Sequence, residues 1–325
     1  MKKKNGIAKI MGTKGAGTVV TAFVGLIIIY VAFGILNPKV FSPLNIQNLL
    51  RSMSKYLLIG VGQSFVMITG NIDLSIGSVV GMSAMISATL MTKGVNPIVA
   101  ILITIICGLV VGIINGQLVG KFKLPPFIAT LGTMFIARGI AYIVNNNRNT
   151  DNIASGIGKD AGDAFQNIFY YGKTAGIFNT FWIALIIFII FFFVLSKTRS
   201  GRHIYAIGSN VDAARLSGVD VVKTTTKAYI VSAFCSTVVG FILCAQAGMG
   251  NMDAGNMYEM YGVAAGVIGG VSPLGGAGIL LGTFAGAGVW QTLENGLNLI
   301  HAQVGFQRII IGVIVVGAVL LDVVI

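Results

Sequence analysis

The feature that most constrains the fold of this chain is a succession of apolar segments, many about twenty residues long, that runs almost from end to end of its 325 residues. The mean hydropathy is +0.88, and 55% of the residues are hydrophobic while only 10% are charged. A helix of about twenty apolar residues crosses a bilayer, because it satisfies every backbone polar group internally. The sequence therefore predicts an all-α, polytopic integral membrane protein with a single transmembrane domain over residues 1–325.

Candidate membrane-spanning helices fall into two groups of different strength. The strongly apolar group is 18–36, 97–119, 126–144, 179–196 and 227–246. The shorter or glycine-interrupted group is 55–70, 75–91, 261–272, 278–299 and 308–324. Together they predict about ten transmembrane helices, an even number that places both termini on the same side of the membrane.

The distribution of basic residues predicts which side that is. The segment 1–17 is lysine-rich, and the loop 197–226 is mostly basic, whereas the opposite loop 145–178 balances both signs. Cytoplasmic loops carry an excess of Lys and Arg, so both termini and loop 197–226 are expected in the cytoplasm. The net charge of +12 then lies mainly at the lipid surface, where anionic headgroups attract it, and it does not indicate nucleic-acid binding.

Glycine is abundant, with 44 residues, and several glycines recur at four-residue spacing within the expected spans. Small residues on one helix face allow helix backbones to approach closely in lipid. The pattern predicts a bundle with many close helix crossings. The glycines concerned are Gly108, Gly112, Gly116 and Gly120, then Gly262, Gly266 and Gly270, and then Gly278, Gly282 and Gly286.

The chain lacks the residues that an enzyme of the common classes needs. Its two histidines, His203 and His301, are far apart and have no acidic or cysteine neighbour at metal-ligand spacing. Gly172-Lys173-Thr174 resembles the end of a phosphate-binding loop, but Asn167 stands where that loop needs a glycine. We therefore expect no catalytic residues, no metal site and no cofactor bound by this chain.

The loop 197–226 contains a short capped helix. Asn210 or Ser209 is a suitable N-cap, the run from Val211 to Ser217 is compatible with a helix, and Gly218 is a natural C-terminal stop. The pattern predicts a helix of about two turns at about 210–218 on the membrane surface. Such a rigid piece suits docking on another protein, and a solvated connector is the alternative.

The stretch TGNIDLSIGS, from Thr69 to Ser78, joins two apolar segments through a short turn. Gly70 and Asn71 permit the turn, and Asp73 or Ser75 can cap the first amides of the next helix, where the helix dipole favours a negative group. No second acid or basic partner nearby in sequence supports an ion-binding or catalytic carboxylate. Asp73 is therefore expected to act first as a helix cap.

Several motifs occur in the order typical of one transporter family. They are TGNIDLSIGS, LPPFIATLGTMFIARGIAYI, GRHIYAIGSNVDAARLSGVDV, MYEMYGVAAGVIGGVSPLGGAGILLGT, NGLNLI and RIIIGVIVVGAVLLD. In these motifs, and over nearly its whole length, the chain resembles the permease subunits of ATP-binding-cassette (ABC) importers for simple sugars, the ribose and galactose permease family.

The resemblance implies the partners and the mechanism. It implies a multi-pass permease in the bacterial cytoplasmic (inner) membrane, paired with a second permease copy as a homodimer. An ABC ATPase subunit would hold ATP and Mg²⁺ on the cytoplasmic side, and an extracytoplasmic binding protein would deliver a ribose- or galactose-like monosaccharide, which then crosses by alternating access. By carry-over, the helix that couples to the ATPase contains Asn210, Ala213, Ala214, Leu216 and Gly218.

Two expectations stay open at the level of sequence. Tyr261 stands where the resembled permeases usually carry an acidic residue after the Tyr-Glu-Leu/Met run, which bears either on docking of the binding protein or on the identity of the solute. A substrate pathway through apolar helices needs a few polar groups, which otherwise serve as inter-helix hydrogen bonds or caps. The candidates are Gln63, Ser64, Asn115, Gln117, Thr130, Thr133, Asn295 and Asn298.

The alternative function is an ion-coupled secondary transporter of a small polar solute, although the chain has few acidic groups within its spans.

Overall fold

The computed structural model describes residues 16–324 and is almost entirely helical. The first fifteen residues of the expected basic N-terminal segment lie outside the described part. In chain order the elements are α2 (Ala16–Leu36), η1 (Pro38–Phe41), α3 (Pro43–Ile68), α4 (Ile76–Thr92), α5 (Pro97–Gly120), α6 (Pro126–Ile143), α7 (Ala154–Ile157), α8 (Lys159–Gln166), η2 (Asn167–Tyr171), β1 (Lys173–Thr174), β2 (Ile177–Phe178), α9 (Asn179–Lys197), α10 (Arg199–Ser209), α11 (Val211–Leu216), α12 (Val221–Ala247), α13 (Tyr258–Ile268), α14 (Leu280–Leu299) and α15 (Val304–Val324).

Five helices of the described part are long and apolar enough to cross a membrane, namely α2, α5, α6, α9 and α12. They coincide with the five strongly apolar segments, so this prediction is confirmed. Four of them expose most of their surface, while 83% of the apolar window of α12 is buried. Helix α12 is therefore the centre of the bundle, and the other four form its periphery.

Several helix boundaries differ from the sequence-based expectation. Helix α3 begins at Pro43, twelve residues before the expected start, and α12 begins at Val221 instead of 227. Both extensions carry polar residues, which lower the hydropathy but leave the helix intact, and Ser42 and Asp220 cap their first turns. Helix α13 ends at Ile268, four residues before the expected end, because Gly270 adopts a left-handed conformation with φ of 79°.

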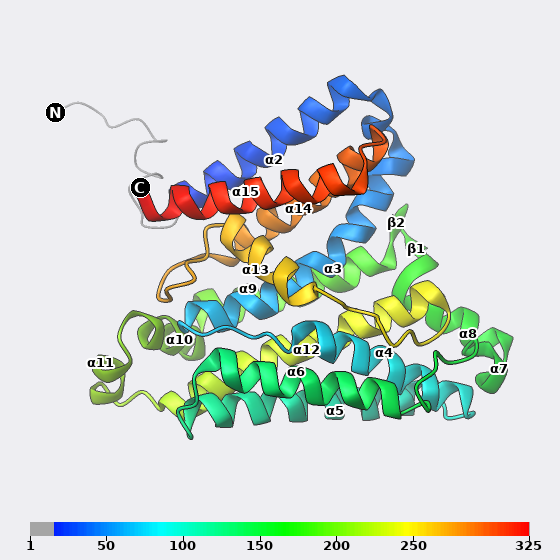
Figure 1. Ribbon diagram of the computed structural model, residues 1–325, viewed down its shortest axis with the longest axis horizontal. Helices are drawn as coiled ribbons and strands as arrows, with labels where there is room; N and C mark the ends of the chain where they lie inside the picture. Colours follow the sequence, from blue (N-terminus) through cyan, green and yellow to red (C-terminus); the bar gives the residue numbers. More distant parts are fainter. Residues whose placement is uncertain (1–15, 325) are drawn as a thin grey trace.

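The helices lie roughly along one direction, with α2 and α15 along the upper edge of Figure 1 and α5 and α6 along the lower edge. Helix α12 packs against α5, α4 and α3, and α14 packs against α2, α3 and α13. Helices α10 and α11 lie at the left end of the bundle, and α7, α8 and the β1–β2 hairpin lie at the right end. The bundle thus has two chemically different ends.

The predicted close helix crossings are confirmed between α5 and α12. A Cβ atom on Gly112 would lie 2.7 Å from the Tyr229 carbonyl oxygen, and one on Gly116 would collide with the backbone of Thr226. Glycine at these positions lets the two helices approach almost backbone to backbone. Gly286 approaches the Ala265 carbonyl oxygen in the same way between α14 and α13.

The segment expected as outer loop 145–178 is more structured than a loop. It contains helices α7 and α8, the π-helical turn η2 and the antiparallel pair β1–β2, in which Lys173 pairs with Phe178. Ile153 and Phe165 are buried against the bundle, and Thr150 donates its amide to the carbonyl oxygen of Gly250. This segment forms an ordered cap over the right end of the bundle.

Candidate functional site

The segment 197–226, which the sequence predicts to lie in the cytoplasm, folds into two consecutive capped helices. The Thr198 hydroxyl accepts a hydrogen bond from the Gly201 amide at 3.3 Å at the start of α10. The Asn210 side chain then accepts from the Ala213 amide at 2.8 Å at the start of α11. Sequence reasoning identified the second helix but missed α10, whose signal was Thr198 followed by apolar residues at helical spacing.

Helix α11 ends at a glycine turn. Gly218 has a φ of 82°, its amide donates to the Arg215 carbonyl oxygen, and the Val219 amide donates to the Ala214 carbonyl oxygen. These two bonds form a Schellman motif, which closes the last turn and reverses the chain toward α12. Asp212 and Arg215 form an exposed ion pair at 3.2 Å on the same helix.

The residues of α11 differ sharply in exposure. Ala214 is buried, whereas Ala213 is exposed and Leu216 is 90% exposed. Leu274, in the connection between α13 and α14, is 84% exposed at the same end of the bundle. Leu274 lines a groove that Asn210, Val211, Asp212 and Arg215 also line, so an exposed leucine lies near α11 on a second segment of the chain.

A closely packed junction joins α10 to the end of α3 and to the connection between α13 and α14. The Gly276 amide donates to the Ile68 carbonyl oxygen at 2.9 Å, and the Tyr205 hydroxyl donates to the Gly278 carbonyl oxygen at 2.6 Å. A Cβ atom on Gly208 would collide with the Ile68 carbonyl oxygen and the Gly276 amide. Burial raises the pKa of Tyr205 to about 12, which keeps the hydroxyl protonated as a donor.

The TGNIDLSIGS turn forms one wall of a groove beside this junction. The groove has a volume of about 600 Å³ and is lined by residues of this turn, of α10, of α11 and of the ends of α5 and α12, together with Leu274. Gly70 has a φ of 76° at the end of α3, and its neighbour Asn71 donates its side-chain amide to the Thr69 hydroxyl at 2.7 Å. The TGNIDLSIGS motif and the motif that forms α10 and α11 are far apart in the sequence, yet both line this groove.

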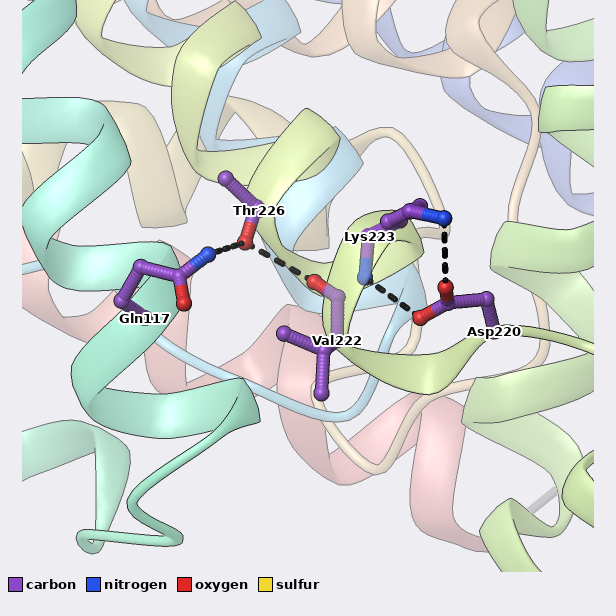
Figure 2. A network of polar contacts seen from close by, with 5 residues as sticks. All are labelled: Gln117, Asp220, Val222, Lys223 and Thr226. Atoms are coloured by element: carbon purple, nitrogen blue, oxygen red, sulfur yellow. Dashed lines mark hydrogen bonds and ion pairs between the residues drawn. The ribbon is translucent and has the colours of Figure 1, made fainter.

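The start of α12 is fixed by polar contacts that Figure 2 shows. Asp220 accepts from the Lys223 amide at 2.9 Å and forms an ion pair with its ammonium group at 3.1 Å. The backbone hydrogen bond from Lys223 holds the pKa of Asp220 below its usual value. On the adjoining helix, Gln117 donates to the Thr226 hydroxyl at 3.2 Å, which ties α5 to α12.

Asp73 is the centre of a buried polar network. It is 1% exposed, and its Oδ1 accepts from the Ser75 amide at 2.9 Å and from the Ser75 hydroxyl at 2.6 Å. Its Oδ2 accepts from the Ser232 hydroxyl of α12 at 2.7 Å. Ser75, although it stands at the N-cap of α4, makes no capping bond with its own side chain.

The network extends through two further helices. Asn115 of α5 donates to the Ser75 hydroxyl at 2.9 Å and accepts from the Thr133 hydroxyl of α6 at 2.6 Å. Asp73 is thus more than a local cap, because the chain of hydrogen bonds joins α4, α5, α6 and α12. The sequence reading missed Ser232, whose only signal was a hydroxyl in an apolar span.

The polar residues expected along a pathway occupy three kinds of environment. Ser64 is bonded to Thr283 at 2.8 Å, Asn295 exchanges hydrogen bonds with Asn45, and Asn298 accepts from Gln307 at 3.0 Å. Thr130 donates to its own helix, to the Pro126 carbonyl oxygen. Both amide atoms of Gln63 are buried and, among the described residues, have no hydrogen-bond partner. A role for these residues in substrate passage stays a prediction.

Comparison with known proteins places the chain in a transporter family. The family described as "Branched-chain amino acid transport system / permease component" matches residues 45–319. The Ribose import permease protein RbsC of Bacillus subtilis (strain 168) is 39% identical over 92% of this chain and 91% of its own length. The D-allose transport system permease protein AlsC of Escherichia coli (strain K12) is 36% identical over 91% and 89%.

A third relative is named for a different solute. The Autoinducer 2 import system permease protein LsrC of Salmonella typhi is 30% identical over 93% of this chain and 84% of its own length. No solved structure matches the chain. Because the family match covers more than half of the chain and the relatives align over most of both lengths, the chain belongs to the permease-component family of ABC import systems.

Proposed function

We propose that this chain is the transmembrane permease subunit of an ATP-driven ABC importer that carries a simple sugar, ribose- or galactose-like, across the bacterial cytoplasmic membrane. The observation that carries the proposal is the alignment, over most of both chains, with permeases named for ribose and for allose. Both names describe monosaccharides, whereas the family description names amino acids. The sugar class therefore rests on the individual relatives.

The proposal includes a topology of about ten membrane crossings with both termini in the cytoplasm. The α10–α11 end of the bundle is rich in basic residues, among them Lys197, Arg199 and Arg202, as the positive-inside rule expects of a cytoplasmic face. The ordered cap of α7, α8 and β1–β2 would then face the outside. This cap and the neighbouring segment 248–257 are where a solute-binding protein would dock.

We propose that α11, with the exposed side chains of Leu216 and Leu274 beside it, docks on the ATPase subunit. The junction of Gly208 with Ile68 and Gly276 supports this role, because it joins α10–α11 to the end of α3 and to the connection between α13 and α14 through backbone contacts. A displacement of α11 would thereby move helices of the membrane core. ATP and Mg²⁺ would bind in the partner, two permease copies would form the pathway, and ATP binding would switch its open side.

The test is reconstitution of the assembled system. The full chain is purified in mild detergent with the proteins that accompany it, and ATP-dependent uptake of D-ribose, D-allose and D-galactose into liposomes is measured with the binding protein present. The expected result is uptake that requires both the ATPase and the binding protein. Uptake by the chain alone that follows a proton or sodium gradient would instead support a secondary transporter.

The double substitution Leu216→Asp with Leu274→Asp is expected to release the ATPase from the permease. Each change places a charge where an apolar side chain would be desolvated by the partner, which costs about 2–3 kcal/mol or more per site. Co-purification with the ATPase should fall at least tenfold, while the melting temperature of the permease stays within about 2 °C, since exposed substitutions seldom affect stability. Leu124→Asp, at a 40% exposed leucine of the α5–α6 connection, is the matched control. Normal ATPase recovery with the double variant would contradict the docking assignment.

A further inference from the structure

Four aromatic side chains from three helices gather near the end of the bundle that carries the β1–β2 hairpin. Tyr261 of α13 lies 5.0 Å from Trp290 of α14 and 5.7 Å from Tyr56 of α3, between ring centroids. Tyr258 lies 5.6 Å from Tyr261 and 6.2 Å from Tyr56. The Tyr56 hydroxyl donates to Oε2 of Glu294 at 2.7 Å. We call these five residues the aromatic–carboxylate cluster.

The position of the cluster follows from its neighbours in α3. Arg51, one turn before Tyr56, lies over the rings of Phe178 of β2 and Tyr170 of η2, at 4.0 and 4.4 Å from their centroids. The cluster therefore lies between the ordered cap and the middle of the bundle, and the second half of α3 separates it from α10. A solute released onto the capped end would meet the cluster before it meets the Asp73 network.

Only some of the polar atoms of the cluster form hydrogen bonds within the chain. Among the described residues, the hydroxyls of Tyr258 and Tyr261 and Nε1 of Trp290 make no hydrogen bond, and neither does Oε1 of Glu294. None of these atoms is among the fully buried groups without a partner. Tyr258, Tyr261 and Glu294 are half-buried, and the neighbouring Met260 is 52% exposed.

This combination has the chemistry of a site for a neutral, polyhydroxylated ligand. Flat aromatic faces accept the C–H face of a sugar ring, while phenol and indole groups at their edges supply hydrogen bonds. A carboxylate accepts bonds from ligand hydroxyls, and Glu294 is held in place by Tyr56, so little conformational freedom is lost on binding.

The conformation of the chain at Met257 brings Tyr258 and Tyr261 to this place. Met257 adopts the left-handed conformation with φ of 64°, which few non-glycine residues do, and α13 starts at the next residue. The turn directs Tyr258 and Tyr261, which are three residues apart on one helix face, toward α3 and α14. Backbone strain held at the entrance of a helix is typical of sites where side-chain placement matters.

We propose that the aromatic–carboxylate cluster is an outer subsite that receives the monosaccharide before it crosses, with Tyr261, backed by the buried ring of Trp290, stacking on the sugar ring and Glu294 accepting from its hydroxyls. The inference rests on the proposed function and adds to it the residues that first contact the solute. Tyr261 and Glu294 are then specificity-determining residues of the permease itself, in addition to any selection by the binding protein.

Binding is measured by tryptophan fluorescence, because the chain has only two tryptophans, Trp182 and Trp290. Trp182 lies outside the cluster and donates to the Thr174 carbonyl oxygen, so Trp182→Phe leaves Trp290 as the sole reporter. The full chain carrying this change, in lipid nanodiscs, is titrated with D-ribose and with D-allose. The expected result is a saturable change in emission with at least one sugar and none with L-leucine or sucrose.

Variants separate a subsite from packing. In the Trp182→Phe background, Tyr261→Ala is expected to weaken sugar binding about tenfold, which is the size of one good aromatic contact, and Tyr261→Phe only two- to fivefold. Glu294→Gln keeps an acceptor for Tyr56 but loses the charge, and about tenfold weaker binding is expected. Tyr171→Ala, at an exposed tyrosine of the cap outside the cluster, is the matched control and should bind like the parent.

Uptake in the reconstituted importer distinguishes failure of the proposed function from failure of the subsite. If the complete wild-type system imports no sugar, the proposed function is wrong. If it imports D-ribose or D-allose but the Tyr261→Ala and Glu294→Gln systems keep the wild-type KM, the subsite is wrong while the function stands. A saturable response to L-leucine alone, or cluster variants that disrupt only the association of two permease copies, would also overturn the subsite. For the Tyr261→Ala and Glu294→Gln systems, the expected result is a KM raised about tenfold, with the maximal rate and the number of permease copies per complex unchanged.

Discussion

Gly208→Val is expected to abolish coupled transport while leaving the membrane bundle folded. A Cβ atom at residue 208 would occupy the space of the Ile68 carbonyl oxygen and the Gly276 amide, and both are backbone atoms that cannot turn aside. Helix α10 must then move away from the end of α3, at a cost of about 3 kcal/mol or more, as for other overpacked contacts. We expect sugar uptake to fall more than tenfold and trypsin to cleave faster at Arg199 and Arg202.

The control for this prediction is Gly139→Ala. Gly139 is also helical, in α6, but no atom lies within 4 Å of its would-be Cβ, so the change should be neutral or slightly stabilising. ATPase activity of the assembled complex is measured in parallel with uptake. Continued ATP hydrolysis without transport in the Gly208 variant indicates a broken mechanical link. Transport at the wild-type rate would show that the junction carries no motion.

Asp73→Ala is expected to destabilise the bundle more than any other single truncation of a polar side chain in this chain. The change removes the acceptor of three hydrogen bonds and leaves donors of Ser75 and Ser232 buried without their partner. The cost is about 3 kcal/mol, the upper range for an unsatisfied buried network. A decrease of roughly 5 °C or more in the melting temperature of the detergent-purified chain is expected, with loss of uptake.

Asp73→Asn tests what the charge contributes. The amide oxygen can still accept from Ser75, but the amide nitrogen is a donor and cannot accept from the Ser232 hydroxyl. If capping is the whole role of Asp73, this variant retains both stability and uptake. We expect instead a melting temperature between those of the wild-type chain and the Asp73→Ala variant, together with reduced uptake, because the hydrogen bond to Ser232 of α12 is lost. Thr92→Ala, which loses a hydrogen bond to the Thr89 carbonyl oxygen within α4, is the matched control for loss of a single local bond.

Much of the fold was accessible from sequence, because lipid imposes one strong condition on every spanning segment. An apolar stretch of sufficient length must be a helix, and the five strongest stretches are helices of that kind. Spacing of glycines also predicted close helix crossings, and the approach of α5 to α12 is one of them, since only a residue without a side chain allows it. The starts of α3 and α12 were not accessible by the same rule, because polar residues near these starts lower the hydropathy on which the rule depends.

The sequence by itself determined the class of protein, the apolar helices, and the short capped helix that Asn210 begins and Gly218 ends, because each of these depends on local chemistry or on the solvent. Only the tertiary structure decided which distant residues meet. It joined Asp73 to Ser232, 159 residues away, and the end of α10 to Ile68. It also gathered Tyr56, Tyr261 and Trp290 into one cluster. Such contacts depend on helix packing and on the few glycines that permit it, and no local pattern in a single sequence encodes them.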